Sequence, residues 1–270
     1  MGSNEPGPPA GELSLVGRLV QASNATFLAE DQDGARFIYK PVAGERPLWD
    51  FPDNTLGRRE VAAWQLSRAA GFDVVPPTWF LEGPYGPGSV QTWIEGSQTD
   101  LVDLVERNDI PDDWFGIVVG LDQEEREVVL VHADAAPLRR MAIFDVIANN
   151  ADRKGAHIIH AQPGADEDEA DETEGAEPGV ASGLVLGVDH GLTFHIENKL
   201  RTVLWGWSGD DLDTDELALV SAAIESLEVL DEWLDPAEVV ATRLRAMALL
   251  EAGQFPSPGD RWPVIPWPPL

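Results

Sequence analysis

Four residues of this chain have the side-chain types that a phosphoryl-transfer site needs. They are Lys40 at the end of an apolar strand, Glu60 at the start of the next helix, Asp152 in a polar loop and Asp189 directly after a later apolar strand. In phosphoryl transfer a lysine holds the nucleotide phosphates, a glutamate orients the lysine, one aspartate positions the nucleophile and another binds Mg²⁺. The residue types and their order along the chain therefore indicate this chemistry.

Each feature also has a simpler interpretation when it is taken alone. Lys40 could be a surface lysine whose aliphatic stem lies on apolar groups, and Glu60 could be favoured by the dipole of its helix. The segment from Asn149 to His157 could be a polar turn held by local backbone hydrogen bonds. The segment from Gly187 to Gly191 could be an ordinary turn as well. The shared order of the four features is what favours the chemical interpretation.

The elements that must position these residues follow from the hydrophobic pattern. Short runs rich in β-branched and aromatic residues predict three strands within 13–20, 25–31 and 35–42, and Asp33-Gly34 is a typical hairpin turn between the last two. The apolar spacing of residues 58–71 predicts a helix that Gly71 ends. Two further strands are expected within 74–83 and 89–96. The predicted order is β-β-β-α-β-β.

The rest of the chain has a more helical pattern. Residues 99–108 and 136–150 are expected to be helices, the C-terminal third is expected to be helical, and strands are expected at 127–132, 157–161 and 183–191. The last 15 residues, rich in Pro and Trp, cannot form a regular helix. We therefore expect an α+β protein with a β-rich N-lobe over 13–95 and a mainly helical C-lobe over 96–270.

Two segments are expected to lie outside these lobes as disordered chain. Residues 1–12 are rich in Gly and Pro, and residues 163–183 hold eight Asp or Glu and no Lys or Arg. The second segment is expected to be a solvated acidic insertion; a regulatory or metal-binding role is the alternative.

Composition excludes several classes of function. The 18 Lys and Arg stand against 48 Asp and Glu, for a net charge of −30, which disfavours nucleic-acid binding and stable docking on anionic membranes. The chain has no cysteine, which excludes disulfides and thiolate metal sites. No secretory signal or long apolar span is evident, so the cytoplasm is the expected compartment.

At these motifs the sequence resembles the phosphatidylinositol 3-/4-kinase-like superfamily, particularly its small bacterial members and the type II phosphatidylinositol 4-kinases, and more distantly the HipA-like kinases. The resemblance spans about residues 13–210. The matching segments are Tyr39-Lys40-Pro41, Arg59-Glu60, Asn150-Ala151-Asp152-Arg153 and Val188-Asp189-His190-Gly191-Leu192-Thr193-Phe194. The resemblance implies a two-lobed kinase-like fold and a phosphotransferase that uses ATP and Mg²⁺ or Mn²⁺.

The resemblance also implies a role for individual residues. Lys40 would contact the ATP phosphates, Glu60 would pair with it, Asp152 would be the catalytic-loop aspartate and Asp189 the metal ligand. Ser23 and Asn24 would belong to the loop that covers the phosphates. The segment that meets adenine would comprise Gln91, Thr92, Trp93 and Ile94.

One position departs from the family pattern. The metal-binding Asn of Asp-Arg-x-x-x-Asn is replaced by His157, whose imidazole suits Mn²⁺ or Zn²⁺ better than Mg²⁺. An ATP-binding pseudokinase or scaffold, and a nucleotidyl transferase on the same fold, are therefore alternatives.

A transition-metal site built from the five histidines together with Asp152 and Asp189 is a further alternative. Because of the net charge, the acceptor is expected to be a protein, the chain itself or a soluble small molecule rather than a lipid.

Overall fold

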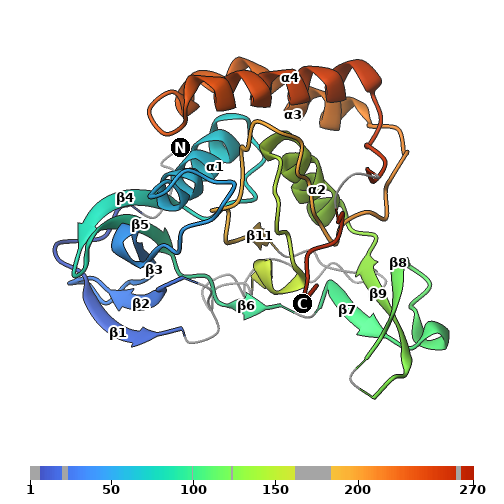
Figure 1. The fold of residues 1–270 in the computed structure, drawn as a ribbon, viewed down its shortest axis with the longest axis horizontal. Coiled ribbons are helices and arrows are strands. Elements are labelled where there is room, and N and C mark those ends of the chain that lie inside the picture. The colour runs from blue at the N-terminus through green and yellow to red at the C-terminus, as the bar shows by residue number, and fades with distance from the viewer. Residues whose placement is uncertain (1–6, 20–23, 99, 123, 162–183, 260–262) are drawn as a thin grey trace, which may run out of the picture.

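The computed structural model describes residues 7–19, 24–98, 100–122, 124–161, 184–259 and 263–270. Its first part is an antiparallel five-stranded sheet with the order β1-β2-β3-β5-β4 (Figure 1). The strands are Ser14–Arg18 (β1), Phe27–Glu30 (β2), Arg36–Pro41 (β3), Thr78–Gly83 (β4) and Gly86–Thr92 (β5). Helix α1, Leu56–Ala69, lies between β3 and β4 in the chain. The predicted order β-β-β-α-β-β is confirmed.

The turn between β2 and β3 forms at the predicted Asp33-Gly34. Gly34 has a φ of 81°, a backbone conformation that glycine adopts without a steric penalty. The Asp31 carboxylate accepts hydrogen bonds from the backbone N–H groups of Asp33 and Ala35, both at 2.9 Å. This turn fixes the register of β3, and with it the face of the sheet on which Lys40 lies.

Helix α1 follows the short 3-10 helix η1, Val42–Gly44, and a loop. It ends just before Gly71, whose φ of 77° stops the helix as predicted. The helix packs on β4 and β5, and its N-terminal part lies next to the segment after β11.

Two three-stranded sheets, β11-β10-β6 and β7-β9-β8, lie in the second part of the chain. Their strands are Gly96–Ser97 (β6), Val102–Val105 (β7), Trp114–Leu121 (β8), Glu127–Ala133 (β9), Ile158–Ala161 (β10) and Val185–Gly187 (β11). The long helices are Ala136–Ala148 (α2), Thr214–Glu225 (α3) and Pro236–Ala252 (α4). This part of the described chain also contains short 3-10 helices at Arg107–Asp109 (η2), Gly155–His157 (η3) and Leu227–Leu230 (η4).

The prediction of a helix at residues 99–108 is wrong. Val102–Val105 forms β7, which pairs antiparallel with β9 from Val102 opposite His132 to Val105 opposite Val129. The segment is short, and an isolated helix of this length is not stable in water. Pairing with β9 supplies its backbone hydrogen bonds instead. The helix expected at 136–150 is confirmed as α2, which ends at Asn149 with a φ of 53°.

The main core joins helices that are distant in sequence. Val61 and Leu66 of α1 belong to the same buried cluster as Met141 and Phe144 of α2 and Val220 of α3. In Figure 1, α3 and α4 lie across α1 and α2, and the sheets lie on the other side of α1 and α2.

The expected α+β class, with sheets early and helices late, is confirmed. The boundary between lobes at residues 95 and 96 stays a prediction. Residues 163–183 and the first six residues of the expected tail lie outside the described residues. In the described part, no helix has the length and apolar character needed to cross a membrane.

Candidate active site

Lys40, Glu60 and Asp189 form one ion-paired group, here named the cavity cluster. The Nζ atom of Lys40 donates a hydrogen bond to Glu60 Oε1 at 2.5 Å and another to Asp189 Oδ1 at 2.7 Å. The side chain of Glu60 is 4% exposed, whereas that of Asp189 is 50% exposed. One carboxylate therefore anchors the lysine from inside, and the other faces the solvent.

The alternation of buried and more exposed side chains along β3 explains the direction in which Lys40 points. Phe37, Tyr39 and Pro41 are buried on one face of the sheet, so Lys40 points to the other face. Glu60 lies on the buried side of α1, and its Oε2 atom accepts the backbone N–H of His190 at 2.9 Å. Asp189 has a φ of 59°, an uncommon conformation for an aspartate.

The charges of the cavity cluster stabilise one another. Burial lowers the pKa of Lys40, but the carboxylates of Asp189 and Glu60 outweigh burial, so the pKa of the ammonium is raised. The Lys40 ammonium holds the pKa of Asp189 well below its usual range. Burial raises the pKa of Glu60, while Lys40 opposes this effect. At neutral pH the lysine is thus firmly cationic and Asp189 firmly anionic.

The loop after α2 brings a second aspartate to the same place. Asp152 Oδ2 lies 3.3 Å from Lys154 Nζ. His157 Nδ1 lies 2.9 Å from the backbone oxygen of Asp152, and because a carbonyl only accepts, Nδ1 carries the hydrogen. Burial lowers the pKa of His157, so its Nε2 atom has a free lone pair, and this atom lies 3.4 Å from Asp189 Oδ2.

A second ionic group, here named the buried cluster, lies beneath the loop and consists of Asp145, Arg153 and His190. Arg153 donates to Asp145 Oδ2 through Nε at 2.7 Å and to Asp145 Oδ1 through a terminal nitrogen at 2.9 Å, and both side chains are fully buried. The same guanidinium donates to the carbonyls of His157 and Val188 at 3.1 and 3.0 Å. Arg153 therefore ties the segments that carry Asp152 and Asp189 to α2.

His190 completes the buried cluster as a neutral side chain. A terminal nitrogen of Arg153 lies 2.7 Å from His190 Nε2, and because a guanidinium only donates, Nε2 accepts. Burial, reinforced by Arg153, lowers the pKa of His190 well below its usual range. Its Nδ1–H is buried without a hydrogen-bond partner among the described residues. The imidazole therefore serves as an acceptor that fixes the residue next to Asp189.

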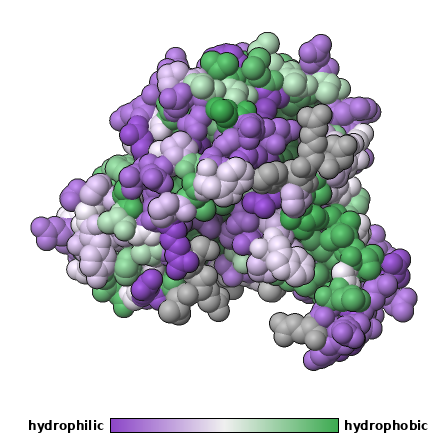
Figure 2. All heavy atoms as spheres, viewed as in Figure 1, coloured by the Kyte–Doolittle hydropathy of each residue, from purple (hydrophilic) through white to green (hydrophobic). Residues whose placement is uncertain are grey.

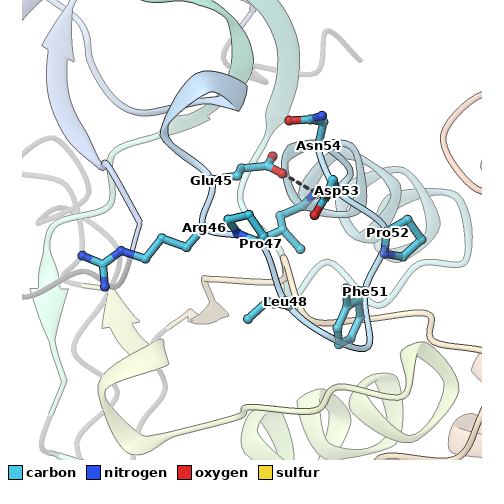
Figure 3. A pocket seen from close by; sticks show the side chains of 9 residues that line it. Glu45, Arg46, Pro47, Leu48, Phe51, Pro52, Asp53 and Asn54 are labelled. Carbon is cyan, nitrogen blue, oxygen red and sulfur yellow. Dashed lines mark hydrogen bonds between the residues drawn. The ribbon is translucent and has the colours of Figure 1, made fainter.

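The cavity cluster opens into a cavity of about 370 Å³. Its lining includes Lys40, Glu60, Asp152 and Asp189 together with Asn24. A smaller cavity of about 110 Å³ adjoins it beneath the loop between η1 and α1 (Figure 3). In this loop, the Glu45 carboxylate accepts the N–H groups of Leu56 and Gly57 at 3.2 and 2.9 Å and so caps α1.

The residues expected around adenine do not line this cavity, and their role stays a prediction. Gln91 is buried in the sheet and donates to Thr78 Oγ1 at 2.9 Å. Neither Gln91 nor its neighbours Thr92, Trp93 and Ile94 line the cavity that holds Lys40. Thr92 Oγ1 and Trp93 Nε1 are buried without a hydrogen-bond partner in the described part of the chain. Asn24 does line the cavity, while Ser23 lies outside the described residues.

The histidines do not gather around one point. His132 Nε2 accepts the Gly206 N–H at 2.9 Å, and His195 Nε2 lies 2.9 Å from the backbone oxygen of Asp50. His160 Nδ1 lies 3.6 Å from Asp100 Oδ2. Within the described ranges, no three His, Asp or Glu side chains are arranged to hold a metal on their own. The five-histidine metal site therefore has no support in this part of the chain.

Sequence analysis missed several residues that the structure places here. Arg46 lines both cavities, and its backbone N–H donates to Asn24 Oδ1 at 2.9 Å. Asp145 and Arg153 were not assigned a role, although a charged residue within the apolar α2 was a signal for a buried ion pair.

The small number of lysines was a second signal of residues near the site. The chain has only three lysines. Lys40 lies in the cavity, Lys154 pairs with Asp152, and Lys199 pairs at 2.6 Å with Asp50 of the loop between η1 and α1.

Comparison with known proteins gives a relative and two structural likenesses. No family model matches the sequence. The chain is similar in structure to the Golgi casein kinase, with a TM-score of 0.49 and 12% identity, over 93% of this chain and 78% of that one. It is also similar to the Helicobacter pylori proinflammatory kinase CtkA, with a TM-score of 0.49 and 8% identity, over 92% of this chain and 95% of that one.

The sequence relationship is much closer. Protein Rv2133c of Mycobacterium tuberculosis is 44% identical over 276 residues, which cover 96% of this chain and 92% of that protein. The chain therefore belongs to the same protein family as Rv2133c.

Proposed function

We propose that this protein is a phosphotransferase that uses ATP and a divalent cation. The observation that carries the proposal is the convergence of Lys40, Glu60, Asp189 and Asp152 on one cavity of about 370 Å³. An anchored lysine beside two aspartates supplies the positive charge, the metal ligand and the base that phosphoryl transfer needs. Catalysis would come from positioning and from compensation of charge.

The residues present fit a divalent cation that arrives with a nucleotide. The lone pair of His157 Nε2 and the Oδ2 atom of Asp189 lie 3.4 Å apart, and neither can donate a hydrogen bond to the other. In the structure the Lys40 ammonium compensates the charge of Asp189, and the two acceptors would hold a divalent cation when it arrives with the phosphates. Two protein ligands are also typical of sites in which phosphates and water complete the coordination. The imidazole favours Mn²⁺ more than an amide oxygen would. When bound, the cation would neutralise charge that develops on the phosphate oxygens.

The roles of the chain's own residues follow from their placement. Lys40 would hold the phosphates with the N–H bonds that it now gives to Asp189, while Glu60 keeps its ammonium in place. Arg46 and Asn24 border the same cavity and would contact the outer part of the nucleotide. Burial raises the pKa of Asp152, which makes this carboxylate a better base than an exposed aspartate. Asp152 would accept the proton of the acceptor hydroxyl as its oxygen bonds to the γ-phosphorus and the bond to ADP breaks.

The acceptor is proposed to be a protein, which includes the chain itself, or a soluble small molecule. The net charge of −30 opposes close approach to anionic lipid or to nucleic acid. A clear signal with anionic lipid vesicles would overturn this part of the proposal.

The first experiment is incubation with γ-³²P-ATP and Mg²⁺ or Mn²⁺. Wild-type protein should transfer label or consume ATP, and Asp189→Asn and Asp152→Asn should each reduce transfer by about a hundredfold or more. Asp109→Asn, at an exposed position in η2, is the matched control and should keep full activity. Transfer that is unchanged in both site variants would contradict the proposal. ATP binding without transfer would point to a pseudokinase.

Nucleotide placement can be tested independently of turnover. An acyl-phosphate derivative of ATP delivers its acyl group to a lysine near the bound phosphates. Because the chain has only three lysines, mass spectrometry can assign the labelled one without ambiguity. We expect the probe to label Lys40 and an excess of ATP to suppress this labelling. Lys199, which is paired with Asp50, should be labelled to the same extent with and without ATP. Labelling that ATP does not suppress would argue against a nucleotide site here.

A further inference from the structure

Helix α4 has an outer face that is rich in exposed apolar side chains. Four large apolar side chains on it are well exposed: Val240 at 56%, Leu244 at 61%, Met247 at 50% and Leu250 at 36%. The helix lies on the outside of the molecule in Figure 1, and hydrophobic residues occur among hydrophilic ones in the same region of Figure 2. Contiguous apolar surface of this kind usually marks a contact with another molecule.

The charge on this face is also unusual. The whole chain has 48 acidic against 18 basic residues. Between Val240 and Glu251, the exposed face of α4 carries one basic residue, Arg243, and one acidic residue, Glu251. Neither side chain forms an ion pair within the described part of the chain, although Arg243 has a long contact of 3.5 Å to the carbonyl of Ile224. The face is therefore locally neutral on a strongly acidic protein.

The inner face of α4 has a different role. Glu238 pairs with the buried Arg59 of α1, and Arg245 donates to the carbonyls of Ile147 and His195 at 3.2 and 3.0 Å. These contacts fix the helix to the core and define which side remains outside. The apolar side chains of the outer face are thus not needed for attachment of α4.

We propose that the outer face of α4 binds the same face of a second copy of this chain, with the two helices antiparallel. The order of residues is self-complementary about Met247. A two-fold axis at Met247 places Arg243 at the level of the partner's Glu251, because each is four residues from the axis. It places Leu244 at the level of the partner's Leu250, because each is three residues from the axis. The two Met247 side chains meet at the centre of such an isologous contact.

Charge selects a second copy over a membrane as the occupant. An amphipathic helix that lies on an anionic membrane normally carries several lysines or arginines along its polar face. Here the exposed face offers only Arg243, and the chain as a whole is strongly anionic. For two copies, this face lets the two negative proteins approach with one basic and one acidic residue from each, which form two opposite-charge pairs across the axis.

The contact is expected to be weak. One pair of helices buries less than the roughly 800 Å² per partner of a standard stable interface, so we expect a dissociation constant in the micromolar range. Because each copy has a charge of −30, added salt should strengthen association by screening the overall repulsion.

The test is sedimentation analysis of the full chain from about 1 to 200 μM, a range that brackets a weak interface. The average mass of the wild type should rise with concentration from 29.4 kDa toward twice that value. Met247→Glu should raise the dissociation constant by about tenfold or more, since it puts two charges at the centre of the contact. Leu121→Glu is the matched control, because Leu121 is 65% exposed on β8 and should leave the dimer intact.

A charge-reversal series tests the arrangement itself. Arg243→Glu alone should weaken the dimer, and Arg243→Glu combined with Glu251→Arg should restore it, because both pairs across the axis re-form. Unfolding midpoints of all variants show whether each still folds, and Met247→Gln replaces Met247→Glu if the latter does not. A wild-type chain that stays at 29.4 kDa, a dimer insensitive to both Met247 variants, or a double variant as weak as Arg243→Glu would each overturn the proposal.

Discussion

The cavity cluster and the buried cluster are both built from ionic side chains, yet they differ in what surrounds them. Arg153 and Asp145 are fully buried, and the guanidinium of Arg153 also satisfies two backbone carbonyls. Lys40 and Asp189 are partly open to the cavity, with side chains 21% and 50% exposed. The buried cluster is closed to any ligand. In the cavity cluster, a ligand can replace one of the ion-pair partners.

This difference separates two uses of the same chemistry. A buried ion pair with all its hydrogen bonds satisfied holds segments in one arrangement, and it is costly to break because one charge is left uncompensated. A partly exposed ion pair costs less to open, since solvent or a bound phosphate can replace either partner. The buried cluster therefore positions the two aspartates, and the cavity cluster is the one suited to bind a ligand.

The largest effect should follow from Arg153→Met. This variant leaves Asp145 buried without its counter-charge and frees the segments that carry Asp152 and Asp189. We expect a loss of about 3–5 kcal/mol in the free energy of unfolding, measured by urea titration. A loss below about 1 kcal/mol would show that the buried cluster does not hold the loops as described.

The next effect concerns His132, which is buried like Arg153 but is held by backbone groups rather than by an ion pair among the described residues. Its Nδ1–H donates to the carbonyl of Ala133 and its Nε2 accepts from Gly206, so the neutral form is fully hydrogen-bonded. Burial lowers the pKa of His132 to about 4 from its usual value of 6.5. Between these values the unfolded chain binds a proton that the folded chain does not, so this stabilisation is present above pH 6.5 and is lost toward pH 4.

The measurement is the free energy of unfolding as a function of pH for the wild type and for His132→Gln. The wild type should lose up to about 3 kcal/mol more than the variant between pH 6.5 and 4. Leu121→Gln, at an exposed position on β8 without a titratable side chain, is the control and should follow the wild type. Parallel curves for the wild type and His132→Gln would contradict the assigned neutral state.

A smaller effect on stability, with a large effect on binding, should follow from Lys40→Met. Glu60 then loses its cation, but burial already raises its pKa, so it can become neutral and limit the cost to about 1–2 kcal/mol. ATP with Mn²⁺ should raise the melting temperature of the wild type and leave that of the variant unchanged. If ATP raised the melting temperature of Lys40→Met as much as that of the wild type, Lys40 would not bind the nucleotide. The cavity cluster would then not be the ligand-binding one of the two clusters.

The smallest effect is expected at an exposed ion pair that belongs to neither cluster. Arg107 lies 2.9 Å from Glu127, with both side chains more than half exposed. Arg107→Gln should change stability by less than about 1 kcal/mol and leave nucleotide binding intact. It is the reference against which Arg153→Met and Lys40→Met are compared in the same urea and thermal experiments.

The sequence predicted the elements that carry the site because their signals are local. The strand ending at Lys40, the helix containing Glu60 and the helix before Asp152 all follow from hydrophobic period and from turn residues such as Gly34 and Gly71. The helix prediction for residues 99–108 was wrong because the structure of this segment depends on pairing with β9, a partner more than 20 residues away. Local pattern cannot report such pairing.

The sequence by itself determined which side chains are available for chemistry, in what order they occur, and that the protein is strongly acidic. Only the tertiary structure decided which of them meet: Lys40 with Asp189 across 149 residues, and Arg46 and Asn24 at the same cavity, while Gln91 to Ile94 lie outside it. The physical reason is that ion pairing and burial depend on distance in space. The buried Arg153 and the exposed Leu244 have opposite surroundings that neither residue's local sequence could show.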